Sequence, residues 1–140
     1  MLAKTRRASE PQADRDEMRL LAMIHYIREV VMVARPEREV LHAIFLDSDR
    51  GFVADQTYGH GQIAALSLRM RELFGRALAV EASGIILAHN HPSGVCRPSL
   101  MDIESTKRLV DICKALDIEL IDHLIITQNS VYSMRAGGIL

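Results

Sequence analysis

The sequence predicts an α/β domain in which a mixed sheet carries helices against its faces. Two kinds of hydrophobic pattern alternate along the chain: apolar positions three or four residues apart, which indicate amphipathic helices, and short apolar runs, which indicate strands. With 140 residues, 49% of them hydrophobic, the chain can bury one core of ordinary size and hardly two. We therefore expect a single domain.

The N-terminal part of the chain is expected to be a tail followed by a helix. Residues 1–13 are polar and contain Pro11, so we expect a flexible tail there. From residue 14 to residue 34, apolar side chains recur on one helical face: Met18, Leu21, Ile24, Ile27, Val31 and Ala34. The pair Arg35-Pro36 ends this helix. The domain is thus expected to cover residues 14–140, including the helix at 14–34.

A hairpin is expected after this helix. Residues 40–47 and 52–57 are strand-like and flank Ser48-Asp49-Arg50-Gly51, where the glycine can supply the positive φ of a tight turn. Gly59-His60-Gly61 is read as a connecting loop. The same patterns predict helices over 62–81 and 99–116, a strand over 84–88, and a final pair of strands over 119–127 and 131–134.

His89-Asn90-His91, with Asp102 further along the chain, is the most informative motif. Residues 85–88 before it form a buried-strand pattern, and alternate side chains of a strand point to opposite faces, so His89 and His91 would project to the same side. Two imidazoles and a carboxylate suit Zn²⁺. Three protein ligands also leave the fourth tetrahedral position open for water, as in catalytic zinc sites. The spacing therefore predicts a zinc site.

A helix cap explains part of this motif without a metal. Ser99 and Asp102 form an S-x-x-D capping box, and a periodic apolar run follows them. The two roles are compatible, because the N-terminus of a helix places free N–H groups and the positive end of its dipole close to the loop. The joint spacing of the histidines and the aspartate favours the metal.

At these residues the chain resembles the JAMM (JAB1/MPN+) metalloproteases, and within them the RadC-like JAB domain proteins. His89, His91, Pro92, Ser99 and Asp102 are in register with the family pattern, whereas Asn90 stands where many peptidase members carry Ser or Thr. The resemblance covers roughly residues 36–140. It implies a three-layer α/β/α sandwich with a mixed sheet, the cytidine-deaminase-like JAB/MPN fold, with the metal at one end of the sheet.

The resemblance also implies a general acid/base and an oxyanion donor. Glu39, directly before the first sheet strand, is the expected general acid/base, and Glu37 is the reserve candidate. The Ser99 hydroxyl is expected to donate a hydrogen bond to the developing oxyanion, although its capping role competes with this use. A zinc-activated water and a carboxylate that relays its proton would together hydrolyse an amide bond.

Other zinc proteins and nucleases fit the sequence less well. In the HNH nucleases the three named residues are dispersed, nucleoside deaminases need a P-C-x-x-C segment, and a zinc finger needs four paired ligands. The two cysteines are Cys96 and Cys113. Cys113 falls on the apolar face of its helix and is expected in the core. Cys96 could approach the metal, but a surface loop thiol is the commoner case.

Charge and hydropathy restrict the partners. The net charge is −1, from 17 basic and 18 acidic residues, so no overall footprint for nucleic acid or anionic membrane exists. A local basic patch remains open, with Arg69, Arg71, Arg76 and Arg97 as candidates. No run is apolar enough for a membrane span or a signal peptide, so we expect a cytoplasmic protein.

Two functional classes follow from these expectations. The first is a zinc metallopeptidase that acts on a peptide or protein substrate. The second is a non-catalytic metal-binding module in DNA repair, replication or mobile-element function. An intact ligand set together with Glu39 favours the first class, because a scaffold has no need of an open coordination position.

Overall fold

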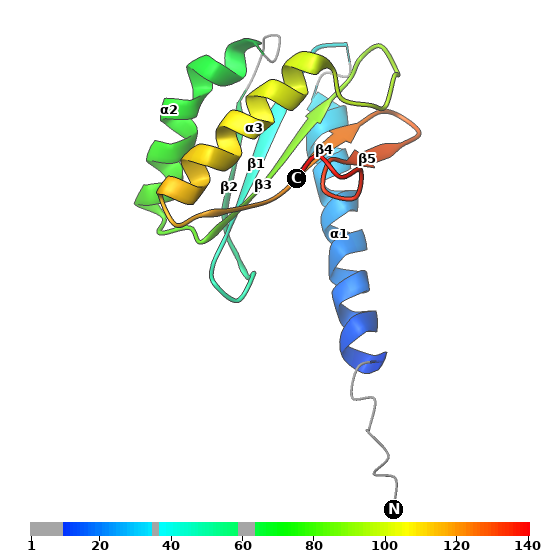
Figure 1. Cartoon of the computed structure of the whole chain (residues 1–140). Coiled ribbons are helices and arrows are strands. Elements are labelled where there is room, and N and C mark those ends of the chain that lie inside the picture. The colour runs from blue at the N-terminus through cyan, green and yellow to red at the C-terminus, as the bar shows by residue number, and fades with distance from the viewer. Residues whose placement is uncertain (1–9, 35–36, 59–63) are drawn as a thin grey trace, which may run out of the picture.

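The structure is a computed structural model that describes residues 10–34, 37–58 and 64–140. Its elements in chain order are α1 (Glu10–Ala34), β1 (Leu41–Leu46), β2 (Phe52–Tyr58), α2 (Ala64–Ala79), β3 (Gly84–Asn90), α3 (Leu100–Ala115), β4 (Glu119–Ile126) and β5 (Val131–Ser133). The expected helices and strands all occur in the expected order. The prediction of an α/β fold is confirmed (Figure 1).

The five strands form one mixed sheet in the order β2-β1-β3-β4-β5. Strand β1 is antiparallel to both β2 and β3, and β5 is antiparallel to β4. Only β3 and β4 pair in parallel, and α3 makes the crossover that a parallel pair requires. Strand β3 lies at the centre, and all of its residues are buried, which explains its continuous apolar run.

Helices cover both faces of the sheet, so the molecule has three layers. On one face, Phe45 and Leu87 pack in a core with Leu73 of α2 and Leu109 of α3. On the other face, β-strand residues such as Ile44 and Ile86 pack against Ile27 and Val31 of α1. Figure 1 shows α2 and α3 together on one side and α1 on the other. Neighbouring residues of β1 and of β3 thus belong to different cores.

Helix α1 begins earlier than expected and is only half covered. It starts at Glu10, so residues 10–13, expected in the tail, are helical; Pro11 falls in the first turn, where its missing N–H costs nothing. Residues 1–9 lie outside the described residues. Ile27 and Val31 are fully buried, whereas Met18 and Leu21 are 69% and 55% exposed, because the helix runs past the sheet (Figure 1).

The β1–β2 turn departs from the expected backbone conformation. The residue with positive φ is Arg50, at 61°, and not Gly51. Gly51 is needed for a different reason: a Cβ there would lie 2.8 Å from Asp47 Oδ2. The Asp47 carboxylate closes the turn by accepting the N–H groups of Asp49 and Gly51 at 2.9 and 2.8 Å. The expected loop at Gly59-His60-Gly61 lies outside the described residues.

Strand β3 is two residues longer than expected, and this matters for the site. It continues through Asn90 because β1 and β4 accompany it, with His89 opposite Leu41 and Ile125. The predicted strand over 84–88 therefore ended too early. His89 belongs to the rigid end of the central strand, not to a loop. In the described part of the chain, no helix has the length and hydropathy needed to cross a membrane.

Candidate metal centre

The central strand determines where His89 points. Residues 85, 87 and 89 share one face of β3, and Ile85 and Leu87 belong to the core beneath α2 and α3. The His89 side chain, 1% exposed, is therefore directed toward the helix layer, where the first turn of α3 carries Asp102. His91 follows directly after the end of β3. As expected, His89 and His91 project to the same side.

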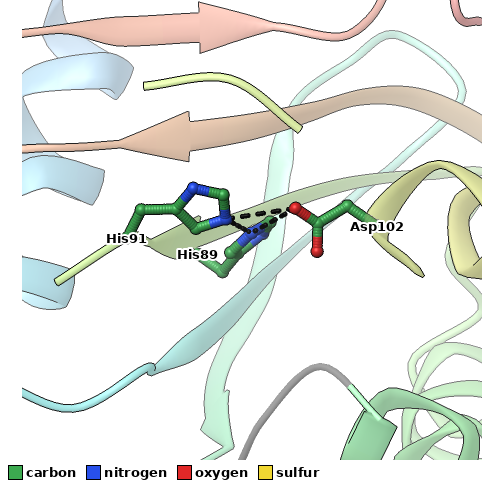
Figure 2. Close-up of side chains that lie close together, drawn as sticks. All are labelled: His89, His91 and Asp102. Atoms are coloured by element: carbon green, nitrogen blue, oxygen red, sulfur yellow. Dashed lines mark hydrogen bonds and ion pairs between the residues drawn. The ribbon is translucent and has the colours of Figure 1, made fainter. Parts of the chain in front are cut away.

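His89, His91 and Asp102 form a group that could hold a metal ion. Figure 2 shows the three side chains pointing toward one another. His89 Nε2 and His91 Nε2 are 3.0 Å apart. Asp102 Oδ2 lies 3.1 Å from His91 Nε2 and 3.6 Å from His89 Nε2. In a tetrahedral zinc site with metal–nitrogen and metal–oxygen distances of about 2.0 to 2.1 Å, two ligand atoms are about 3.3 to 3.4 Å apart. The three measured separations scatter around that value.

Hydrogen bonds at the Nδ1 atoms of the two histidines direct the lone pairs of their Nε2 atoms toward the space between the three side chains. His91 Nδ1 lies 2.9 Å from the carbonyl oxygen of Val95; because a carbonyl only accepts, Nδ1 is the donor. In neutral His91, Nε2 then carries a lone pair that faces Asp102 Oδ2 and His89 Nε2. Lone pairs that converge in this way repel one another unless a cation or a proton lies between them. The donor set therefore fits a divalent metal.

His123 holds the other histidine from behind. Its Nε2 lies 2.7 Å from His89 Nδ1, and its Nδ1 lies 2.8 Å from Thr106 Oγ1. His123 is fully buried; burial lowers its pKa well below the ordinary value, and the neighbouring His89 acts in the same direction. Neutral His123 can accept from His89 Nδ1–H and donate to Thr106, which leaves His89 Nε2 free for a metal.

The neighbouring Asp122 does not belong to this network. Its carboxylate accepts the backbone N–H groups of His123 and Arg135 at 2.7 and 3.1 Å and the hydroxyl of Ser133. It therefore fastens the C-terminal segment to β4. Of these two neighbouring residues, only His123 contacts a member of the possible metal-binding group.

Asp102 combines the two roles that the sequence left open. The backbone N–H of Ser99 donates to Asp102 Oδ2 at 2.8 Å, and the N–H of Asp102 donates to Ser99 Oγ at 3.1 Å, so the capping box is present. Burial alone would raise the pKa of the Asp102 carboxyl, but the imidazole of His89 and the N–H of Ser99 outweigh it and hold that pKa below its usual range. The buried Oδ1 has no hydrogen-bond partner among the described residues.

Asn90 positions the segment that carries Glu39. Its side-chain Oδ1 accepts the N–H of Val40 at 2.6 Å, and its Nδ2 donates to the carbonyl of Arg38 at 2.8 Å. Both neighbours of Glu39 are thus held by one buried amide. Leu41 pairs with His89, so continuing the antiparallel register places Glu39 opposite His91. No local pattern in the sequence indicates this contact.

Glu39 and Ser99 line a cleft beside the histidines. The cleft has a volume of about 330 Å³ and is lined by Glu39, His91, Pro92, Ser93, Val95, Arg97, Pro98 and Ser99. Glu39 Oε2 is buried, and no described residue forms a hydrogen bond with it. Glu37, the reserve candidate, is exposed and is not among the lining residues. The geometry brings together all five residues expected at the site.

The cysteines and arginines named from the sequence lie in different places. Cys113 is buried in the core, and burial raises its pKa to about 11. Cys96 Sγ donates to the carbonyl of Ile125 at 3.4 Å and does not belong to the possible metal-binding group. Arg71 and Arg76 lie on α2, whereas Arg97 lines the cleft. The side chain of Arg69 lies outside the described residues.

Comparisons with known proteins agree with this geometry. Residues 19–139 match the model of the RadC-like JAB domain family. A UPF0758 protein of Burkholderia thailandensis is 36% identical over 117 residues, which are 84% of this chain and 44% of that protein. The UPF0758 protein YkfG of Escherichia coli is 38% identical over 118 residues, which are 83% of this chain and 75% of YkfG.

A third relative is the UPF0758 protein of Leptothrix cholodnii, 35% identical over 130 residues, which are 93% of this chain and 54% of the relative. The chain thus spans less than half the length of its Burkholderia relatives. Because the family model covers the whole sheet and all the residues of the possible metal-binding group, this chain belongs to the RadC-like JAB domain family.

Proposed function

We propose that this chain is a zinc-dependent hydrolase of amide bonds, a metallopeptidase or isopeptidase that acts on a peptide or protein substrate. One observation carries the proposal: a compact group of two imidazoles and a carboxylate lies beside a cleft lined by Glu39, whose buried Oε2 has no hydrogen-bond partner among the described residues. A structural metal site would be closed by a fourth protein ligand. Here the group contains only three donor residues from the described part of the chain, and the next side chain, Glu39, is a proton acceptor.

Zinc suits this donor set better than the harder divalent cations do. Neutral imidazole nitrogens and one carboxylate oxygen are borderline ligands, whereas Mg²⁺ and Ca²⁺ prefer sites built from oxygen atoms alone. When bound, zinc would lower the pKa of a coordinated water toward neutrality and polarise the carbonyl of an amide. His89, His91 and Asp102 would hold it, with His123 and Val95 fixing the orientation of the two rings.

Glu39 and Ser99 supply the remaining chemistry in this proposal. The Glu39 carboxylate accepts a proton from the attacking water and passes it to the leaving amine, and Asn90 keeps it at the wall of the cleft for both steps. The Ser99 hydroxyl accepts the N–H of Asp102, so its own proton remains available to a substrate oxygen. Capping and oxyanion stabilisation therefore use different parts of the same hydroxyl.

The alternative is a non-catalytic metal-binding module in DNA repair, replication or mobile-element function. One observation favours it: Asp102 Oδ2 and Ser99 Oγ already serve the cap of α3, so the motif has a structural use of its own. The buried, unpartnered Oε2 of Glu39 counts against it, because a scaffold would have to bear the cost of burying that acceptor without a partner.

The test compares Glu39→Gln with the parent chain, and Glu37→Gln serves as the matched control because Glu37 is exposed and outside the cleft. Zinc content is measured on all three proteins, followed by a screen of peptide and isopeptide substrates. We expect all three to bind zinc, and we expect Glu39→Gln alone to lose hydrolysis, by about 10²- to 10⁴-fold. Loss of zinc from Glu39→Gln, or full activity in it, would contradict the assigned role.

A further inference from the structure

Arg97 is a charged side chain in the cleft with no internal task. It is exposed and lines the cleft together with Glu39, and no described residue forms an ion pair or hydrogen bond with its guanidinium. Glu39 and Asp102 already provide the two negative charges that balance a divalent cation. The positive charge of Arg97 is therefore surplus to the site and is available to a ligand.

The loop that carries Arg97 is held in place from both sides. Before it, the carbonyl of Val95 accepts from His91 Nδ1 at 2.9 Å, and the thiol of Cys96 donates to the carbonyl of Ile125 at 3.4 Å. After it, Ser99 caps α3. The backbone of Arg97 is thus fixed relative to His91 and Asp102, so only its side chain has to be ordered when the guanidinium binds a partner.

Part of the cleft wall around Arg97 is apolar. Pro92, Val95 and Pro98 line the same cleft, and Val95 is 47% exposed. Directly after Ser99, the side chains of Leu100 and Met101 are 80% and 48% exposed. Exposed apolar side chains beside a cleft are typical of a surface that binds another molecule. The cleft therefore combines the charge of Arg97 with an apolar rim of Pro92, Val95 and Pro98, and Leu100 and Met101 follow the lining residue Ser99 in the chain.

We propose that Arg97 determines substrate specificity by binding a carboxylate close to the scissile amide, while apolar side chains of the substrate lie on Val95, Leu100 and Met101. This inference rests on the proposed amide hydrolase function. The carboxylate belongs either to an acidic side chain or to the C-terminus of the substrate chain. A guanidinium suits both, because its planar donors match the two oxygens of a carboxylate.

A peptide fits this cleft better than the backbone of a nucleic acid does. Phosphate binding relies on several basic residues along a groove. Among the described residues that line the cleft, Arg97 is the only lysine or arginine, and Glu39 adds a negative charge to the same wall. The apolar rim also offers nothing to a phosphodiester backbone. Acidic or C-terminal peptide segments are therefore the favoured ligands.

The experiment measures binding without turnover, in the zinc-loaded Glu39→Gln chain. The probes are fluorescent hexapeptides of leucine, alanine and serine with blocked ends, in which one glutamate is moved through every position, and a matched set with glutamine instead. A third set is neutral and has a free C-terminal carboxylate. Each set is titrated with the zinc-loaded Glu39→Gln chain and with the same chain carrying Arg97→Ala or Arg97→Lys. Arg71→Ala, at an exposed position of α2, is the control for the loss of a charge elsewhere.

We expect one of two preferences, each of about fivefold in affinity. If the carboxylate is a side chain, a glutamate peptide binds more tightly than its glutamine partner. If it is the C-terminus, a peptide with a free C-terminal carboxylate binds more tightly than the same peptide with a blocked end. Arg97→Ala should abolish the preference, Arg97→Lys should retain part of it, and Arg71→Ala should leave it intact. Equal affinity for charged and neutral peptides would overturn the inference, as would an equal loss in Arg71→Ala. A short DNA duplex whose binding depends on Arg97 more than peptide binding does would also overturn it.

Hydrolysis of the same peptides by the parent chain separates the two proposals. Cleavage without any carboxylate preference would leave the hydrolase function standing and remove the role of Arg97. Carboxylate binding that depends on Arg97, without cleavage of these peptides or of any peptide or isopeptide substrate in the screen, would remove the hydrolase function and leave the recognition.

Discussion

Replacing Asn90 with alanine should separate positioning of Glu39 from binding of the metal. Asn90 is 1% exposed, and its amide holds the N–H of Val40 at 2.6 Å and the carbonyl of Arg38 at 2.8 Å. Val40 is 3% exposed, so its N–H would lose its partner out of reach of water, at a cost of about 1 to 3 kcal/mol. Arg38 is exposed, and its carbonyl can turn to solvent instead. We therefore expect a loss of about 2 to 3 kcal/mol in the free energy of unfolding.

The effect on catalysis should be larger than the effect on stability. With both neighbours of Glu39 released, the carboxylate would no longer be fixed at the cleft wall, and misplacement by about 1 Å costs on the order of 10²-fold in rate. Denaturant unfolding, zinc content and kcat/KM of a cleaved peptide are measured for Asn90→Ala and for Ile44→Ala. Ile44 is a core residue of β1, 2% exposed, whose truncation costs about 2 to 5 kcal/mol without freeing Glu39.

Zinc content and activity of the two variants decide whether Asn90 positions Glu39. Asn90→Ala should keep its zinc and lose about a hundredfold in kcat/KM, whereas Ile44→Ala should lose stability and keep most of its activity below its unfolding transition. Equal activity in the two variants would mean that Asn90 is only a structural residue. Asn90→Ser, which carries the residue type found at this position in many peptidase relatives, should retain more activity than Asn90→Ala if one hydrogen bond to the segment is kept.

Three further predictions concern histidine and cysteine chemistry. Burial lowers the pKa of His42 below the ordinary 6.5, although Asp55 acts in the opposite direction, and burial lowers the pKa of His123 further. Below about pH 6.5 the unfolded chain therefore binds more protons than the folded chain does. The zinc-free protein should lose stability as the pH falls from there. Denaturant unfolding between pH 8 and pH 5 checks this, and a flat profile would contradict it. His123→Ala should weaken zinc binding about 10- to 100-fold in a competition titration with a chelator, because His89 loses the partner that fixes its ring. Unchanged zinc affinity would show that His123 does not orient His89 for metal binding. Cys96, half-buried, should react with an alkylating agent faster than Cys113, which is 1% exposed and whose pKa burial raises to about 11. Because Cys96 Sγ contacts the Ile125 carbonyl, zinc should not protect it, and protection would show that the thiol reaches the metal.

Local patterns in the sequence were sufficient for the order of the elements and for the possible metal-binding group. The apolar run before His89 indicates a buried strand, strand alternation puts His89 and His91 on one side, and the capping box brings Asp102 to the start of α3. Each of these inferences depends on residues close together in the chain. The fold class and the convergence of the three side chains could be predicted for that reason.

The contacts behind the site could not be predicted in the same way. Asn90 meets the segment around Glu39 across fifty positions of sequence, and His123 meets His89 across thirty-four. Both contacts depend on the register between strands that no short turn joins, so turn geometry does not specify it. The exposed half of α1 has the same origin. An apolar stripe shows which face of a helix could be buried, but where the sheet ends decides how much of that face is covered.

The partly covered α1 helix has a consequence for motion. Its C-terminal half is anchored: Ile27 and Val31 are buried, and Arg28 donates to the carbonyls of Thr127 and Gln128. A helical segment of about 12 residues is marginal in water by itself, so the uncovered half depends on the anchored half as its nucleus. Amide hydrogen exchange should therefore slow along the helix from residue 14 toward residue 31. We therefore expect the N-terminal half of α1 to unwind and rewind while its C-terminal half, held against the sheet, stays in place.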